Sequence, residues 1–216
     1  HDWFNQENWY PNRNRIPNIK SNAVIKEGRI AWVGEDKVAD LGVAQTKNLE
    51  MRDGSGLVIK QDGRMAVDST ITRTDNTSSI SIENGADGYG ALTVKKGDIQ
   101  INTSVYGYAV NTGTYDNNVV WQYFGVPVNT GNTADVDFYR SWITQWTEDV
   151  LAVNRKLGAN WSYIVNGDKL NLFEGYALTQ TAVKNYPLKG MLINDDKTIE
   201  GMSYTIIDDP VEMKHN

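Results

Sequence analysis

Short apolar segments alternate with closely spaced glycine turns through the first half of this 216-residue chain. The segments predict strands at 23–25, 29–33, 57–60, 64–67, 79–82, 91–94 and 99–101. The turn signals between them are Glu27-Gly28, Asp53-Gly54, Asp62-Gly63, Asn84-Gly85, Asp87-Gly88 and Lys96-Gly97. Strands this short at this spacing are typical of a sandwich, a barrel or a β-solenoid. The sequence therefore predicts an all-β fold.

Residues 1–110 are predicted to form a β-solenoid-like region, or another stack of short strands. Leu92-Thr-Val-Lys-Lys-Gly-Asp-Ile-Gln-Ile101 has the same shape as the stretch around Val58 and Asp62-Gly63: apolar positions two apart, a turn, then apolar positions again. The uneven spacing of such units leaves both arrangements open. The polar lead-in 1–20 carries Trp3 and Trp9, which are expected to cover the open end of the first coil.

A change of composition divides the chain. Residues 103–120 are polar and rich in Asn, Thr and Gly, so we place a domain boundary there. Residues 115–216 are dense in aromatics and are predicted to form a β-sandwich of jelly-roll type, truncated at its end. The run Phe138–Glu148 is interpreted as a strand with Trp142 and Trp146 on one face, and a short helix is considered over Asp149–Lys156.

Two stretches resemble a family of large modular proteins. The opening, with Asp2-Trp3, Asn8-Trp9-Tyr10-Pro11, Ile16-Pro17 and Ala23-Val24-Ile25, is similar to the entry into β-solenoid-like regions of adhesin-like surface proteins of Bacteroidota. Trp121–Val128, Phe138-Tyr139, Leu172–Tyr176 and Leu188–Leu192 look like the β-sandwich that follows such regions. The resemblance implies a protein exported across the outer membrane, secreted or held at the cell surface, without catalytic residues. The stretch Thr147–Gly158 is an insertion relative to the family.

The sequence contains few of the residues that common catalytic mechanisms require. It has no Cys, and its two histidines are His1 and His215. The interior of the sequence therefore lacks the residues for thiol catalysis, for Ser-His-Asp catalysis and for zinc sites with His or Cys ligands. Paired carboxylates as in glycosidases remain open at Asp135 with Asp137, but such pairs in polar stretches are more typical of turns. A net charge of −6 argues against a nucleic-acid partner. No cofactor or metal is expected.

The sequence offers two further kinds of candidate site. Oxygen-rich clusters at Tyr115–Asn118 and Asn194–Asp196 suit calcium, although no complete calcium loop is present. Asp68-Ser69-Thr70 matches the short acceptor pattern for protein O-glycosylation in Bacteroidota, which makes Ser69 a candidate modification site; an ordinary polar turn is the alternative.

The tryptophans give the candidate binding site. Trp142, Trp146 and Trp161, flanked by Gln145, Asn154 and Asn160, are candidates for a platform that stacks on sugar rings. Aromatics at strand spacing also fill sandwich cores, and that interpretation is preferred from the sequence alone.

We therefore expect a non-catalytic structural or adhesive module, with both ends cut from a longer protein. Its expected partners are other domains of the parent protein and glycans or proteins of the host or environment. The alternative is a glycan-binding module of a polysaccharide-degrading system. No apolar stretch reaches the roughly 20 residues of a membrane span.

Overall fold

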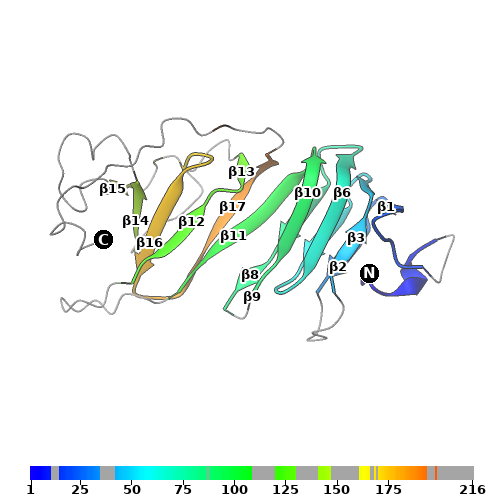
Figure 1. Cartoon of the computed structure of the whole chain (residues 1–216), viewed down its shortest axis with the longest axis horizontal. Coiled ribbons are helices and arrows are strands. Elements are labelled where there is room, and N and C mark those ends of the chain that lie inside the picture. The colour runs from blue at the N-terminus through cyan, green and yellow to red at the C-terminus, as the bar shows by residue number, and fades with distance from the viewer. Residues whose placement is uncertain are drawn as a thin grey trace, which may run out of the picture.

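The computed structural model describes residues 1–10, 15–34, 42–86, 88–108, 120–129, 141–146, 161–165, 168, 170–193 and 198. In this part of the chain every element except the short 3₁₀ helix Gln6–Asn8 is a strand, which confirms the all-β prediction. The strands form a six-stranded, a five-stranded and a four-stranded sheet and one two-stranded hairpin (Figure 1).

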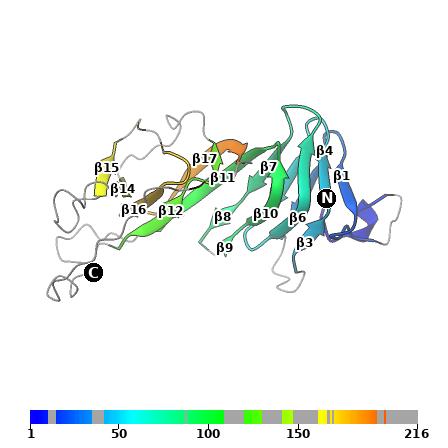
Figure 2. The same cartoon turned by 45° about the horizontal axis from the view of Figure 1, so that its top comes forward.

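The first half of the chain alternates between two parallel sheets. The five-stranded sheet has the order β1-β4-β6-β10, with β3 also paired to β6. Its strands are β1 (Asn22–Ile25), β3 (Ala44–Thr46), β4 (Asn48–Met51), β6 (Arg64–Arg73) and β10 (Ala91–Gly97). After each visit to this sheet the chain crosses to the other one, at β2 (Ile30–Val33), β5 (Gly56–Ile59), β7 (Ser79–Ile82) and β11 (Gln100–Gly107). Each coil has one strand in the six-stranded sheet and one strand, or the consecutive pair β3 and β4, in the five-stranded sheet. Figures 1 and 2 show the coils following one another along the molecule.

The registers of the parallel strands give the number of residues in each coil. Ile30 pairs with Gly56, Gly56 with Ser79, and Ser79 with Gln100, so equivalent positions lie 26, 23 and 21 residues apart. The inward positions alternate with outward ones, as a pleated strand requires. Leu57, Ile59 and Ile80 point between the two sheets and are fully buried.

All seven strands predicted in the first half are present, with three corrections. Strands β3 and β4 were not predicted. Strand β11 continues to Gly107, so residues 103–107 belong to a strand and not to a boundary loop. The Asp68-Ser69-Thr70 triplet lies inside β6 and not in a turn.

The six-stranded sheet continues into the second half of the chain. Its order is β13-β17-β11-β7-β5-β2, where β13 is Val128–Asn129 and β17 is Lys184–Leu192. Strand β17 runs antiparallel to β11 from Gln100↔Met191 to Gly107↔Lys184. The predicted regions 1–110 and 115–216 thus share one sheet and are joined by main-chain hydrogen bonds.

The four-stranded sheet has the order β12-β16-β14-β15 and is antiparallel throughout. Its strands are β12 (Gln122–Gly125), β14 (Ser141–Trp146), β15 (Trp161–Ile164) and β16 (Gly175–Gln180). The Tyr186 hydroxyl of β17 donates to Gln180 of β16 and hydrogen-bonds with Ser141 of β14, so one face of this sheet packs on the six-stranded sheet. Buried residues of both halves form a single hydrophobic cluster.

The amino-terminal segment packs against the first coil. Trp3 donates its main-chain N–H to Trp32 O (2.8 Å), and Trp32 donates to His1 O (2.9 Å). The Trp3 side chain is fully buried, and the Trp9 ring meets it edge-on at a centroid distance of 4.7 Å. Trp9 Nε1 also donates to Trp3 O (2.8 Å). These two aromatics thus close the end of the six-stranded sheet at β2.

The close approach of successive coils depends on glycine at one corner. A Cβ at Gly34 would lie 2.5 Å from the Cα of Gly63, and a Cβ at Gly90 would lie 2.8 Å from Ile59 O. A Cβ at Gly63 would overlap Val33 O and lie 2.9 Å from Lys60 O. Since real Cβ atoms do not approach main-chain atoms this closely, the corner is packed to the limit that glycine allows.

Candidate functional site: an aromatic sheet face

Strand β14 presents Trp142 and Trp146 on the same side of the four-stranded sheet. Side chains alternate along a strand, so both tryptophans and Thr144 lie on one side of the sheet, and Ile143 lies on the other side, where it is buried against the core. The prediction that this run is a strand with both tryptophans on one face is confirmed.

Antiparallel pairing brings more aromatics to this side. Trp146 of β14 is directly opposite Trp161 of β15. One row crosses all four strands, from Tyr123 of β12 through Ala177 and Thr144 to Tyr163 of β15. Residues directly opposite in antiparallel strands point to the same side of the sheet. We call the side that carries Tyr123, Trp142, Trp146, Trp161 and Tyr163 the aromatic face.

The rings form a layer over small residues. The Trp161 centroid lies 5.2 Å from that of Trp146 and 6.1 Å from that of Tyr123. Trp161 and Tyr123 come from the two outer strands, so their side chains lean toward each other above the inner strands β16 and β14. This explains why Ala177 and Thr144 between them are 3% and 5% exposed although they point outward.

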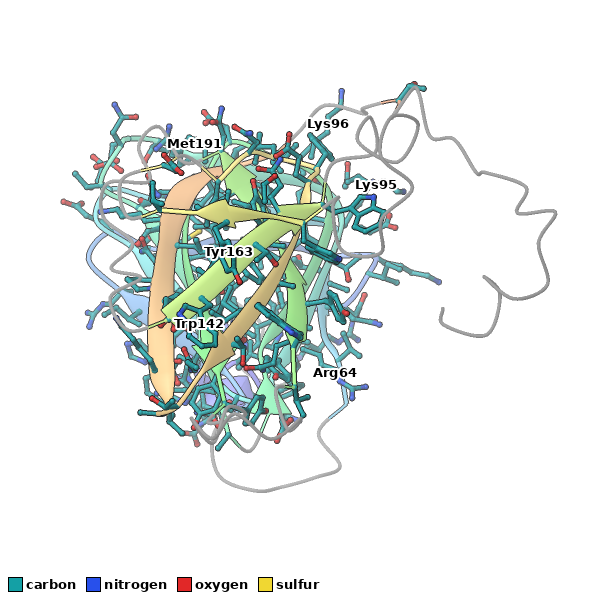
Figure 3. The ribbon with its side chains drawn as sticks, turned by 90° about the vertical axis from the view of Figure 1, so that its left-hand side faces the viewer. Arg64, Lys95, Lys96, Trp142, Tyr163 and Met191 are labelled. Atoms are coloured by element: carbon teal, nitrogen blue, oxygen red, sulfur yellow. The ribbon has the colours of Figure 1, made fainter. Side chains whose placement is uncertain are left out.

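The outer surface of this layer is open to solvent. Tyr123 is 73% exposed, Tyr163 68%, Trp142 53% and Trp146 36%. Trp142 and Tyr163 are labelled in Figure 3, which looks at the end of the molecule formed by the four-stranded sheet. Exposed aromatic patches of this kind typically mark a binding site, because burying them in the core would otherwise stabilise the fold.

The opposite side of the sheet is firmly held. Tyr176 and Leu178 of β16 are buried there, and the Phe124 ring stacks on Tyr176 at 5.4 Å. The Tyr176 hydroxyl accepts from Asn171 N (2.5 Å) and donates to Glu174 Oε2 (3.1 Å). Burial, together with the nearby Glu174 carboxylate, raises the pKa of Tyr176 to about 12. The residues of the aromatic face therefore belong to a sheet whose other side is packed, and not to a loop.

The described strand residues of the aromatic face are uncharged. The residues that the paired strands place on it are Tyr123, Gly125, Trp142, Thr144, Trp146, Trp161, Tyr163, Gly175, Ala177 and Thr179. None of these carries a charge. The hydroxyls of the two tyrosines and the Nε1 groups of the tryptophans supply hydrogen-bonding groups at the ring edges.

The structure brings the three predicted tryptophans together and corrects part of their setting. Core burial, preferred from the sequence, is wrong for Trp142 and Trp146, which are both exposed. Gln145 points to the other side, where its Nε2 donates to Glu174 Oε2 (2.5 Å). Asn154 and Asn160 lie outside the described residues. Tyr123 and Tyr163 were not predicted as site residues, although each alternates with inward positions in an aromatic-rich strand.

Ser69 lies at an irregularity of β6. Between Val67 and Thr70 this strand has one residue more than β10 has between Val94 and Lys96, which is a β-bulge. Ser69 N donates to Lys47 O (2.9 Å), and its side chain is half-buried. Glycosylation of Ser69 stays a prediction, which mass spectrometry of a peptide from native protein would test.

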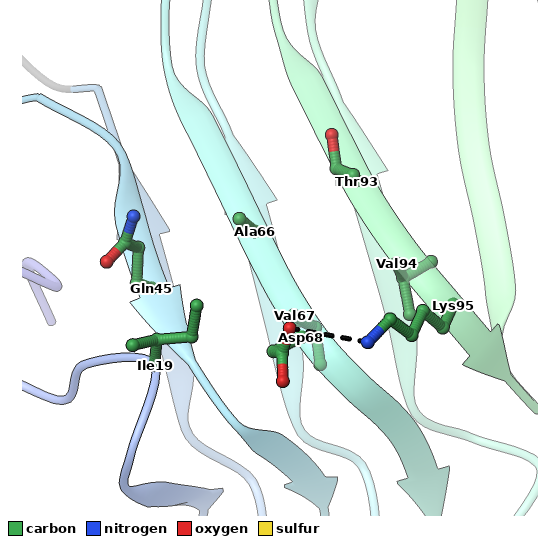
Figure 4. Close-up of a pocket in the computed structure, with 8 residues that line it drawn as sticks. All are labelled: Ile19, Gln45, Ala66, Val67, Asp68, Thr93, Val94 and Lys95. Carbon is green, nitrogen blue, oxygen red and sulfur yellow. Dashed lines mark hydrogen bonds and ion pairs between the residues drawn. The ribbon is translucent and has the colours of Figure 1, made fainter.

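A shallow groove lies beside this bulge, on the outer side of the five-stranded sheet (Figure 4). Gln45, Ala66 and Thr93 form one row across three strands, and the small Ala66 makes the depression. An Asp68–Lys95 ion pair of 3.5 Å closes one end. The volume is about 180 Å³. Because its charged pair is satisfied and it is open, the groove is a weaker candidate site than the aromatic face.

Several predicted clusters fall on residues outside the described part of the chain. They are the carboxylates Asp135 and Asp137, the calcium candidates Tyr115–Asn118 and Asn194–Asp196, and the helix considered at Asp149–Lys156. Among the described residues, no group of three or more His, Asp or Glu side chains is placed to hold a metal ion. The described helices include none with the length and apolar character of a membrane span.

Comparison of the chain with protein-family models, with curated proteins and with solved structures finds no match.

Proposed function

We propose that this chain is a non-catalytic adhesive module of a secreted or cell-surface protein, and that its aromatic face binds glycans. The observation that carries the proposal is the exposure of Tyr123, Trp142 and Tyr163 on one face of a sheet whose other face is packed. The resemblance to adhesin-like surface proteins of Bacteroidota supports the location and the adhesive role.

The chemistry of the face favours a sugar over a protein partner. Sugar rings have apolar C–H faces that pack on aromatic rings, and hydroxyl edges that hydrogen-bond to Tyr, Trp and Thr. The core of a protein interface is enriched in Met and Arg as well as aromatics. The paired strands place neither on this face, and they place no Leu, Ile or Val there.

The coil stack suits a structural role in such a protein. Strands stacked in parallel register make a stiff body in which each coil contacts its neighbours. The four-stranded sheet at one end of this body then presents the aromatic face away from it (Figures 1 and 3). Adhesion through this face needs only non-covalent contact.

A glycan array tests the proposal directly. The unaltered protein is expected to bind a restricted set of glycans, and Trp142→Ala is expected to weaken that binding about tenfold or more, as loss of an aromatic anchor does in other interfaces. The matched control is Tyr10→Ala, which removes an aromatic that is 80% exposed in the amino-terminal segment. Absence of binding across a broad array, or equal loss in both variants, would reject the glycan function.

A further inference from the structure

On the basis of the proposed function, we infer that the aromatic face takes an uncharged glycan chain that lies across the strands, with Tyr123 and Tyr163 contacting opposite ends of the bound segment. The ligand class is thus a neutral oligosaccharide or polysaccharide and not a single sugar or a polyanion.

The direction of the bound glycan follows from the row Tyr123–Ala177–Thr144–Tyr163, which crosses the four strands. Tyr123 and Tyr163 belong to the two outer strands of the described sheet. With three strand spacings between them, their Cα atoms lie roughly 14 Å apart. A single sugar ring does not span this distance, whereas a short oligosaccharide does.

The rings between the two tyrosines make the surface continuous. Trp161 contacts Tyr123 on one side and Trp146 on the other, and the small Ala177 and Thr144 lie beneath these rings. A ligand that reaches from one outer strand to the other therefore meets aromatic surface along its length. Tyr123 and Tyr163, the most exposed members of the face, belong to its two outer strands.

The absence of charge selects the ligand class. The paired strands place no Lys, Arg, Asp or Glu on the aromatic face. Recognition of uronate or sulfate groups relies on Arg or Lys, through charge-assisted hydrogen bonds. The net charge of −6 on the whole chain adds a long-range repulsion toward polyanions. A neutral glycan meets neither obstacle.

Affinity electrophoresis against two matched panels of soluble polysaccharides tests the ligand class. The neutral panel is xylan, glucomannan and mixed-linkage β-glucan, and the anionic panel is polygalacturonate, alginate and heparin. We expect retardation by at least one neutral polymer, little change of that retardation with added salt, and no retardation by the anionic panel.

The variants Tyr123→Ala and Tyr163→Ala test the orientation. Calorimetric titration with oligosaccharides of increasing length, from disaccharide to hexasaccharide of the neutral polymer that binds, should show affinity rising with length in the unaltered protein. Each tyrosine variant is expected to weaken hexasaccharide binding about tenfold and disaccharide binding much less, because a short ligand does not reach both outer strands. Tyr10→Ala serves again as the control.

The outcomes separate this inference from the proposed function. Salt-sensitive binding of an anionic polymer that Trp142→Ala abolishes would overturn the neutral ligand class and leave glycan binding in place. Equal affinity for disaccharide and hexasaccharide would overturn the orientation across the strands. Absence of binding to both panels and to the glycan array would overturn both proposals.

Discussion

Tyr176 anchors the four-stranded sheet through a single hydroxyl. Its ring is buried beside Phe124, and its oxygen accepts a main-chain N–H from Asn171, five residues earlier. The turn between them places Phe173 at a φ of 62°, in the left-handed region that few side chains favour. The Tyr176 hydroxyl therefore holds a strained turn on the strand that supports the aromatic face.

Tyr176→Phe should destabilise the protein by roughly 1–3 kcal/mol, because the part-buried hydrogen bonds of the hydroxyl with Asn171 N and with the Glu174 carboxylate are lost while the ring remains. Chemical denaturation monitored by tryptophan fluorescence measures this loss. Tyr163→Phe is the control, since the Tyr163 hydroxyl lies on an exposed side chain, and it should change stability little. An unchanged midpoint in Tyr176→Phe would show that the turn is held by other contacts.

Tyr176 also makes stability depend on pH. Its folded pKa of about 12 lies above the ordinary value of 10.0, so folding favours the protonated phenol. This contribution is fully present below pH 10 and is lost as the pH rises toward 12. The free energy of unfolding should therefore fall more steeply between these values in the unaltered protein than in Tyr176→Phe. Identical slopes would contradict the raised pKa.

Gly63 shows how one missing side chain controls the spacing of coils. Gly63→Ala should cost about 1–3 kcal/mol, because the new Cβ would displace main-chain atoms of Val33 and Lys60. Gly175→Ala is the matched control, since a Cβ there meets no atom within 4 Å. Thermal unfolding of the two variants measures the difference. Equal melting temperatures would show that the corner can relax.

At the scale of elements, the closure of the first coil depends on Trp3. Replacing this fully buried side chain in Trp3→Ala should destabilise the protein by about 3–5 kcal/mol, through lost burial and the cavity left behind. Trp142→Ala, on an exposed aromatic, should stay within about 0.5 kcal/mol of the unaltered protein. Denaturant titration compares the two. Equal small losses would mean that Trp3 does not close the coil.

The sequence predicted those strands whose ends are marked by glycine turns and whose apolar residues alternate without interruption. It missed β3 and β4 because their buried positions are Ala44, Thr46, Leu49 and Met51. The spacing of two residues is broken between Thr46 and Leu49, and no strongly apolar run marks the pair. Their strand conformation is determined by pairing with β6, which no local pattern reveals.

The three tryptophans of the aromatic face were predicted as candidate site residues, but their exposure was not. Alternation places Trp142 and Trp146 on one side of a strand, but it does not say which side meets the core. That choice depends on Tyr176, Leu178 and Ile143 filling the opposite side, and on the antiparallel register that adds Tyr123 and Tyr163. Registers between strands distant in sequence are tertiary information.

At the scale of the whole molecule, the shared six-stranded sheet couples the two halves. Strand β17 pairs with β11 over eight residues, from Gln100↔Met191 to Gly107↔Lys184. The composition change near residue 115 indicated a division, but composition does not report strand pairing. Buried residues on both sides of this division belong to one cluster.

The protein should therefore unfold in a single cooperative transition. Trp3→Ala and Tyr176→Phe lie in opposite halves, yet both should shift the whole calorimetric transition without splitting it, because neither half keeps its sheet when the other unfolds. Differential scanning calorimetry of both variants provides the measurement. A second peak that moves in only one variant would show that the halves unfold independently.

The coils on the six-stranded sheet are 26, 23 and 21 residues long, yet their strands stay in register. Among the described residues, differences in length are absorbed where the chain turns between the sheets and at the bulge in β6, so the perimeter of the stack varies while the strands stay paired. Residues can be gained or lost at the corners outside the close contacts of Gly34, Gly63 and Gly90 without disturbing the ladder of strands. Evolution of such a molecule can thus erase every trace of a repeating sequence and still preserve a repeating shape.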